Sequence, residues 1–243
     1  MTTGVSLAAP NQRTLIVGRT GSGKTVAALF HLSQANLEDK PWVVIDFKGD
    51  ENINSIQNIE YIKPDADLSR IGPGLYVLRL RVDQQAQLEQ FLWNVYEREN
   101  MGIMADEGYM IGQGARFSPA FRAILTQGRS KNIGVIINSQ RPVWLDVFAK
   151  SEANKIQIYH LNSVKDRNTI SEFLGDALGP DVQERLAPYH SIYYDIDTNT
   201  AVELGPVPPP DVSVKLIEAR LAAIRQYKDV QVPTVRERTI KRV

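Results

Sequence analysis

The sequence predicts an α/β protein whose mostly parallel central sheet is flanked by helices. Three observations support this prediction. A glycine-rich loop stands between an apolar run and a helix-forming run at residues 13–29. Further short apolar runs alternate with stretches of helical periodicity, which is the order of a parallel sheet with helical crossovers. Two of these runs end in carboxylates, at Asp46 and at Asp106-Glu107, and ligands gather at the carboxyl edge of such sheets.

The composition indicates one large folded domain. The 243 residues are 43% hydrophobic and 23% charged, which fits a packed globule. The absence of cysteine excludes disulfides and thiolate metal ligands. Lys+Arg and Asp+Glu balance at 28 each, so the net charge does not argue for nucleic acid binding. No apolar run approaches the roughly 18 residues of a membrane span, and the N-terminus lacks a signal-peptide pattern, so we expect a cytosolic chain without a transmembrane segment.

The glycine-rich loop has the pattern of a P-loop in the context that this motif requires, with a strand before it and a helix after it. Its glycines let backbone N–H groups approach a polyphosphate without a Cβ in the way, and the helix start adds a favourable dipole. Lys24 is expected to neutralise the β- and γ-phosphate oxygens, and Thr25 to offer its hydroxyl to Mg²⁺. We therefore predict that ATP binds to Gly18, Thr20, Gly21, Ser22, Gly23, Lys24 and Thr25.

A second motif follows the apolar strand predicted at residues 101–105. Asp106 and Glu107 come directly after this strand, which is the Walker B arrangement. Asp106 is expected to hold Mg²⁺, directly or through water, and Glu107 to polarise the attacking water. Two carboxylates after an apolar run are a weak signal alone. Downstream of a P-loop in an alternating chain, the catalytic interpretation is much the stronger.

Two more strand ends place polar side chains at the same predicted edge. Asp46 ends the strand predicted at 41–46, and Lys48 follows it; both could approach the nucleotide, or they could be solvated loop charges. Gln140 follows the strand predicted at 132–138, and it could report the γ-phosphate by hydrogen bonding to water or phosphate. The alternative is a simple turn stopped by Pro142.

The remaining elements follow from periodicity and turn residues. The glycine-rich segment 108–119 predicts a mobile loop with no regular element. We assign residues 1–205 to the core, and 206–243 to a proline-rich linker, a helix and a basic tail packed on or beside the core. The tail is either a solvated end or a contact to a subunit or DNA. Further strands are predicted at 59–62, 74–80, 155–160, 191–195 and 201–204, and the last two are expected to form a C-terminal β-hairpin across residues 197–200. Further helices are predicted at 83–100, 121–129, 143–151, 164–174 and 211–227. The tail cations are Arg236, Arg238, Lys241 and Arg242.

Several stretches beyond these motifs resemble the FtsK/HerA superfamily of DNA-pumping ATPases. Residues 44–49 are similar to that family's strand ending in Asp-x-Lys-Gly, and residues 128–142 resemble its arginine, glycine and TQRP series, with Ser139 in place of the usual Thr. Asp166-Arg167 looks like part of its later motifs. The resemblance covers residues 13–196 and implies a RecA/FtsK-like P-loop NTPase core. With little beyond the motor core, the chain looks like the genome-packaging ATPases of internal-membrane viruses, the tectivirus-like phages and their archaeal counterparts.

The resemblance implies an ATPase that pumps double-stranded DNA into a preformed capsid as a homo-oligomeric ring, expected to be a hexamer. An arginine of the neighbouring subunit would complete each site, with Arg129 and Arg167 as candidates and Arg141 third. Gln140 would couple the phosphate state to movement. DNA would be contacted through its phosphates, without sequence preference, by the loop containing Arg116. The expected location is the host cytoplasm and the packaging vertex of the virion, against capsid or membrane proteins.

Three other functions stay open. One is a conjugation or plasmid-transfer pump of the same superfamily, and a second is a non-pumping virion-assembly ATPase. The third is a small-molecule kinase that also uses a P-loop. Kinases of that kind need an acceptor pocket and lid arginines, whereas the consecutive Asp106 and Glu107 fit water activation better.

Overall fold

The strands of the main sheet run almost all in one direction. The computed structural model describes residues 11–113, 116–174 and 186–229, and within them nine strands form this sheet in the order β11-β10-β9-β1-β8-β5-β2-β4-β3. Pairing is parallel from β9 to β3 and antiparallel at β10 and β11, which confirms the predicted mostly parallel sheet with a C-terminal hairpin. In that order the strands are Thr200–Leu204, Ser191–Asp195, Lys155–Ile158, Arg13–Val17, Gly134–Ser139, Gly102–Ala105, Pro41–Asp46, Gly74–Arg79 and Glu60–Ile62.

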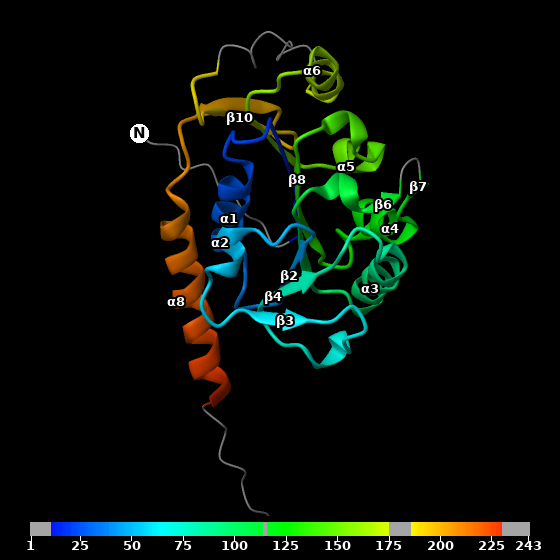
Figure 1. The fold of residues 1–243 in the computed structure, drawn as a ribbon, viewed down its shortest axis with the longest axis vertical. Helices are drawn as coiled ribbons and strands as arrows, with labels where there is room; N and C mark the ends of the chain where they lie inside the picture. The colour runs from blue at the N-terminus through cyan, green and yellow to red at the C-terminus, as the bar shows by residue number, and fades with distance from the viewer. Residues whose placement is uncertain (1–10, 114–115, 175–185, 230–243) are drawn as a thin grey trace, which may run out of the picture.

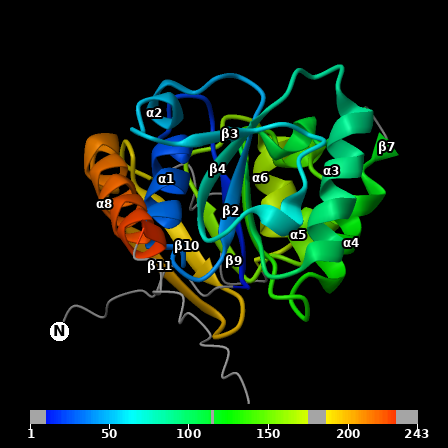
Figure 2. The same ribbon diagram turned by 90° about the horizontal axis from the view of Figure 1, so that it is seen from below.

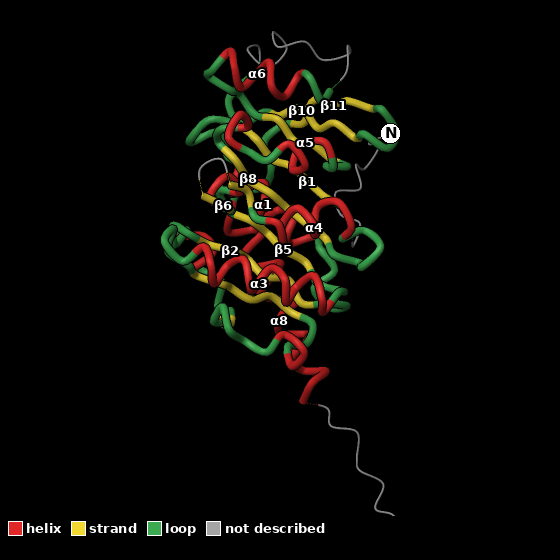
Figure 3. Tube along the Cα trace, turned by 90° about the vertical axis from the view of Figure 1, so that its right-hand side faces the viewer, coloured by secondary structure: helices red, strands yellow, loops and turns green. Residues whose placement is uncertain are grey.

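Helices cover both faces of the sheet (Figures 1 and 2). One face carries α1 (Lys24–Gln34), α2 (Glu51–Asn54) and α8 (Pro210–Asp229). The other carries α3 (Gln85–Arg98), α4 (Pro119–Gln127), α5 (Val147–Ser151) and α6 (Val164–Ser171), and Figure 3 views the molecule from the side of these helices. Short 3₁₀ turns η1 (Leu68–Arg70), η2 (Gly108–Met110) and η3 (Pro142–Trp144) connect the elements. The layers are those of a doubly wound α/β fold.

The central strands read as continuous apolar runs because both of their faces are buried. In β1, Leu15 and Val17 join the core under α3 and α4, whereas Ile16 between them joins the core under α1 and α8. The same alternation in β2 sends Val43 to one core and Val44 to the other. The two cores therefore hold the sheet between the helical layers and fix its register.

The C-terminal helix α8 packs along α1. Its Ile217 is fully buried in the core that α1 shares, and Arg220 donates from Nε to Glu38 Oε1 at 2.6 Å and from one terminal nitrogen to the Ser33 carbonyl at 2.6 Å. None of the described helices combines the length and apolarity that a membrane-spanning segment requires. The predicted basic tail lies outside the described residues, and the division at residue 205 stays a prediction.

Two segments differ from the sequence-based prediction. Residues 108–119 contain η2 and the short antiparallel pair β6 (Gly112–Gln113) and β7 (Arg116–Phe117), where we expected no regular element. Glycine is compatible with such tight turns, so glycine content alone could not exclude them. The helix predicted at 143–151 is interrupted between η3 and α5, because Asp146 caps α5 through the Phe148 N–H and also pairs with Arg122 at 2.5 Å.

Candidate active site

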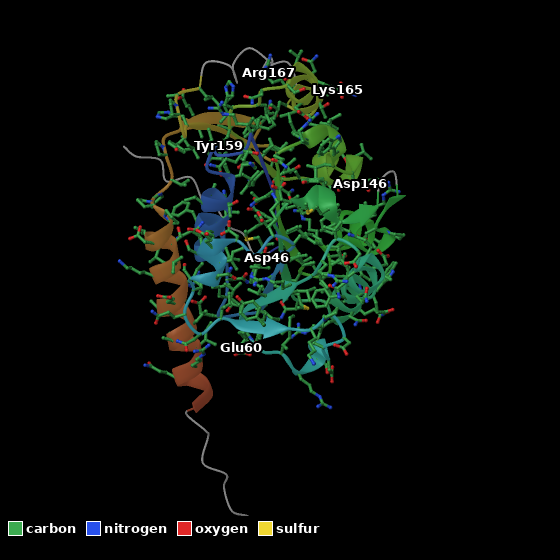
Figure 4. All side chains as sticks on the ribbon, viewed as in Figure 1. Asp46, Glu60, Asp146, Tyr159, Lys165 and Arg167 are labelled. Atoms are coloured by element: carbon green, nitrogen blue, oxygen red, sulfur yellow. The ribbon has the colours of Figure 1, made fainter. Side chains whose placement is uncertain are left out.

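Five parallel strands bring their carboxyl ends to one edge of the sheet. The P-loop follows β1, Asp46 ends β2, Asp106 follows β5, Gln140 follows β8 and Tyr159 follows β9. Backbone hydrogen bonds join the P-loop to its neighbours, since the Gly18 N–H donates to the Ser139 carbonyl at 3.3 Å and the Arg19 N–H to the His160 carbonyl at 2.8 Å. Figure 4 labels Asp46 and Tyr159 among the side chains at these strand ends. The predicted site residues from four separate motifs therefore share one edge.

The P-loop backbone has the conformation that its glycines allow. Gly21 and Gly23 have φ angles of 75° and 99°, in the left-handed region that side chains disfavour. Lys24 is buried at the start of α1, and its Nζ donates to the Arg19 carbonyl at 2.9 Å. Burial lowers the pKa of Lys24, and the charges of Glu107 and Asp106 oppose that shift. An ammonium beside the backbone N–H groups of a glycine-rich loop at a helix start is a site for a polyphosphate.

A buried polar network supports the P-loop from behind. His31 Nε2 lies 2.8 Å from Gln157 Oε1, and Gln157 Nε2 donates to the Tyr159 hydroxyl at 3.1 Å and to Ser191 Oγ at 2.9 Å. A side chain at Gly18 would place its Cβ 2.6 Å from the Tyr159 Cβ, so glycine is required there. The network ties α1, β9 and β10 together beneath the loop, and buried networks of this kind stiffen what they hold.

Gln140 connects the P-loop to η2. Thr20 Oγ1 donates to Gln140 Oε1 at 2.6 Å, and Gln140 Nε2 donates to the Tyr109 hydroxyl at 3.4 Å. Pro142 begins η3 directly afterwards, so the turn that it was expected to make is also present. Gln140 therefore touches the phosphate loop from the end of β8, which is the position that a reporter of the γ-phosphate would need.

Asp106 is a buried carboxylate that fits a magnesium site. Burial raises its pKa to about 6, and Asn138 Nδ2 donates to its Oδ1 at 3.2 Å. Asn138 Oδ1 is itself buried without a hydrogen-bond partner in the described structure. The part of the chain that the structure describes holds no group of three or more His, Asp, Glu or Cys side chains. Mg²⁺ is bound by one or two carboxylates together with phosphates and water, and the buried Asp106 can supply one such carboxylate. With the Thr25 hydroxyl at the start of α1, these oxygens match the donor chemistry of Mg²⁺.

Glu107 has an uncommon backbone conformation, with φ at 58° and ψ at 60°. Non-glycine residues adopt this left-handed conformation at a cost, and such residues gather at functional sites. Its side chain is buried, and Oε1 forms an ion pair with Lys48 from the loop after β2. Oε2 is also buried, but it has no hydrogen-bond partner in the described part of the chain. Glu107 therefore keeps one carboxylate oxygen available.

Asp46 organises the loop after β2. It is fully buried, its Oδ1 accepts from the N–H groups of Lys48 and Gly49 at 3.0 and 2.7 Å, and its Oδ2 pairs with Arg79 at 2.8 Å. Both carboxylate oxygens are thus used within the protein. The expected contact between Asp46 and the nucleotide stays a prediction, and the structure gives this residue a loop-forming role that the sequence did not suggest.

The comparison with known proteins identifies the family. The chain is 42% identical over 207 residues to the DNA packaging ATPase P9 of Enterobacteria phage PRD1, a match that covers 82% of this chain and 89% of that one. The chain belongs to the P9 family. This confirms the resemblance to packaging ATPases drawn from the motifs, although no protein-family model matches the chain.

Solved structures share the fold of this P9-family chain. The genome packaging NTPase B204 of Sulfolobus turreted icosahedral virus 2, in complex with sulfate, matches with a TM-score of 0.68 at 19% identity, over 82% of this chain and 98% of that one. The same protein in complex with ATP-gammaS has a TM-score of 0.63. VirB4 of Thermoanaerobacter pseudethanolicus matches with a TM-score of 0.63 at 12% identity, over 87% of this chain and 93% of that one. These likenesses confirm the predicted fold.

The three candidate arginines of the P9-family chain lie in different environments. Arg129 is exposed in the loop before β8, at the edge of the sheet opposite the P-loop. Arg167 is buried, and one terminal nitrogen donates to the carbonyls of Leu161 and Asn162 at 3.0 and 3.1 Å. Arg141 lies with its Nε 2.9 Å from Asp166 Oδ2 and with its guanidinium 4.5 Å from the centre of the Trp144 ring. None of the three is thus brought into the P-loop of its own chain.

A pocket that the sequence did not predict lies beside the P-loop. The cavity has a volume of about 310 Å³, and its lining includes Arg19, Tyr159, His160, Tyr189 and His190. The strand predicted at 155–160 already contained Tyr159 and His160. Ligands bind at the carboxyl ends of parallel strands, so this position in the sequence could have marked Tyr159 and His160 as candidate binding residues. Tyr189 precedes the hairpin, and no signal in the sequence connected it with the P-loop.

Proposed function

We propose that this P9-family protein hydrolyses ATP and uses the energy to move double-stranded DNA into a preformed capsid. The observation that carries the proposal is the convergence of Lys24, Asp106, Glu107 and Gln140 at one sheet edge in a chain of this family. The expected product of each cycle is ADP and phosphate. The expected place of action is the host cytoplasm and the packaging vertex of the virion.

In the proposed reaction each motif has one task. Lys24 and the P-loop N–H groups bind the β- and γ-phosphates, and Thr25 and Asp106 supply oxygens for Mg²⁺. The bound metal would neutralise charge that develops on the phosphate oxygens. Glu107 orients and polarises the attacking water, and Gln140 responds to the γ-phosphate through its contact with Thr20.

The pocket beside the P-loop suits the adenine base of ATP. Tyr189 offers exposed aromatic surface for stacking, and the two histidines offer polar contacts. Tyr159 is buried and supports the pocket from beneath. The pocket adjoins Gly21 and Ser22, so a nucleotide with its phosphates in the loop would extend its base into it. This assignment adds Tyr189 to the predicted site.

A homo-oligomeric ring, expected to be a hexamer, would complete the site with an arginine from the neighbouring subunit. Arg129 is the favoured candidate because it is exposed, whereas the guanidinium of Arg167 is buried against backbone carbonyls. DNA contact is assigned to the loop that contains Arg116, in which β6 and β7 pair. The contacts would be to DNA phosphates, because a packaging motor must pass any sequence.

The first test measures ATPase rate against protein concentration, with and without long duplex DNA, for the wild type and Glu107→Gln. We expect the rate per subunit to rise with concentration and with DNA, and to fall by about 10²- to 10⁴-fold in the variant. A rate that ignores both concentration and DNA would overturn the ring motor. Full activity of the variant would remove Glu107 from the mechanism.

A conjugation pump remains the second candidate, because the pCW3 conjugation coupling protein TcpA shares the fold over 85% of this chain, with a TM-score of 0.58 at 14% identity. Genes for capsid proteins beside the coding sequence would favour packaging, whereas a relaxase gene would favour transfer.

A further inference from the structure

We propose that Lys48 is a positioning residue for Glu107, whose carboxylate it holds by one oxygen so that the other oxygen faces the attacking water. The proposal rests on the hydrolytic function proposed above, in which Glu107 polarises that water. Lys48 lies in the predicted Asp-x-Lys-Gly segment, where the sequence left open whether it approaches the nucleotide or is a solvated loop charge.

The two oxygens of the Glu107 carboxylate have different surroundings. Oε1 is paired with the Lys48 ammonium, whereas Oε2 is buried and has no donor in the described part of the structure. Leaving a buried acceptor without a donor is costly, and such groups in native proteins call for a ligand, a water or a catalytic role. A water molecule that donates to Oε2 would satisfy this oxygen and be the water that Glu107 activates. General bases are commonly oriented by a third group in this way.

Lys48 is well placed to fix the direction of the carboxylate. Its backbone N–H donates to Asp46 at 3.0 Å, and Arg79 holds the other oxygen of Asp46 at 2.8 Å. The Lys48 side chain therefore starts from a loop that is tied to the end of β2. Glu107 follows β5, which pairs directly with β2, so the ion pair joins two adjacent strand ends. The Lys48 side chain is itself 46% exposed, so the restriction comes from its tethered backbone and from the buried Glu107 carboxylate that it contacts.

The ion pair also separates the roles of two lysines. Burial lowers the pKa of Lys24, and the nearby Glu107 carboxylate acts in the opposite direction, so the two charges lie close together. A free Glu107 carboxylate would be attracted to the Lys24 ammonium, which the phosphate needs. In the structure Lys24 instead donates to the Arg19 carbonyl at 2.9 Å, and Glu107 is held by Lys48. Lys48 thus keeps the base away from the phosphate-binding lysine.

The experiment compares Lys48→Met and Lys48→Arg in the assembled protein with duplex DNA present. We expect Lys48→Met to lower kcat by about 10- to 100-fold, part of what a general base supplies, while KM and the affinity for a non-hydrolysable ATP analogue stay unchanged. Lys48→Arg should restore part of the rate, because it retains the charge. Lys215→Met is the matched control: Lys215 forms an exposed ion pair with Asp211 on α8, and its loss should leave kcat unchanged.

A double-mutant cycle with Glu107→Gln separates positioning from direct phosphate contact. If Lys48 acts only through Glu107, adding Lys48→Met to Glu107→Gln causes no further loss of the single-turnover rate. A further loss, or a raised KM with unchanged kcat, would overturn the proposal because Lys48 would then bind phosphate itself. If a folded Lys48→Met variant keeps the wild-type kcat while Glu107→Gln is inactive, the proposed role of Lys48 is wrong and the role of Glu107 stands. If Lys48→Met does not fold, an inactive but folded Lys48→Arg overturns the proposal, and a partly active one supports it.

Discussion

Asp106 behaves unlike an exposed aspartate because burial opposes its charge. Its pKa rises from 3.8 to about 6, and the charges of Glu107 and Asp50 add to the shift, whereas Asn138 and Lys48 oppose it. The folded protein therefore holds this proton more tightly than the unfolded chain does. The resulting stabilisation is fully present below pH 3.8 and is lost as the pH rises through about 6. At neutral pH the ionised Asp106 costs stability, and a bound cation would offset that cost.

This cost predicts that Asp106→Asn stabilises the protein when nucleotide and Mg²⁺ are absent. We expect the free energy of unfolding to rise by about 2 kcal/mol at pH 8, because the neutral amide avoids burying a charge. At pH 5, where the wild-type Asp106 is mostly protonated, the gain should be smaller by about 1 kcal/mol. Urea unfolding at the two pH values measures both quantities. Asp211→Asn, which changes an exposed carboxylate, should have no comparable effect. A gain that does not depend on pH would contradict the explanation.

At the scale of elements, the loop between β2 and α2 is held by Asp46. The buried carboxylate accepts from two backbone N–H groups at 3.0 Å or less and from Arg79. Removing it leaves all of these donors without their partner. The loop carries Lys48, so the order of this loop also determines where Glu107 points.

We therefore expect Asp46→Ala to lower the free energy of unfolding by about 3 kcal/mol, as the loss of a buried hydrogen-bonded charge does. Asp67→Ala is the control: Asp67 caps η1 from an exposed position, and its loss should cost no more than about 1 kcal/mol. Denaturant unfolding and binding of an ATP analogue are measured together. Weaker binding with unchanged stability would instead support a direct contact between Asp46 and the nucleotide.

The elements that the sequence predicted well are those set by local chemistry. The strand 41–46 is reproduced in full. The helix predicted at 121–129 is found as α4 at Pro119–Gln127, two residues earlier, because Ser118 caps it and Pro119 occupies its first turn. Partners across the sheet could not be predicted, because they depend on strand order. The contact of Thr20 with Gln140 spans 120 residues, and that of Lys48 with Glu107 spans 59. The motifs thus indicated the edge of the sheet, and the fold decided which side chains meet there.

At the scale of the whole molecule, the position of Arg129 bears on assembly. Arg129 precedes β8, whereas Gln140 follows the same strand. A strand of this length separates them by about 20 Å, at about 3.3 Å per residue. Arg129 is therefore remote from the P-loop of its own chain and could complete only a neighbour's site.

This geometry predicts complementation between two inactive variants. Arg129→Ala and Glu107→Gln should each lose most of their ATPase activity, and mixing the two should restore part of it. An Arg129→Ala subunit keeps Glu107, and a Glu107→Gln subunit keeps Arg129. In a mixed ring some sites therefore combine the Glu107 of one variant with the Arg129 of its neighbour. Ser130→Ala, in the same loop, should remain active alone. Absence of any recovery in rings shown to be mixed would exclude Arg129 as the arginine supplied in trans.

The buried network of His31, Gln157 and Tyr159 has a consequence for how the protein distinguishes substrate from product. A loop that is stiff before its ligand arrives spends little binding free energy on ordering, whichever nucleotide it binds. The bond between Thr20 and Gln140 lies at the other side of the loop, and it joins two side chains rather than backbone. The Thr20–Gln140 bond is therefore the adjustable part of a stiff loop, and the presence of the γ-phosphate would be communicated to β8 through it.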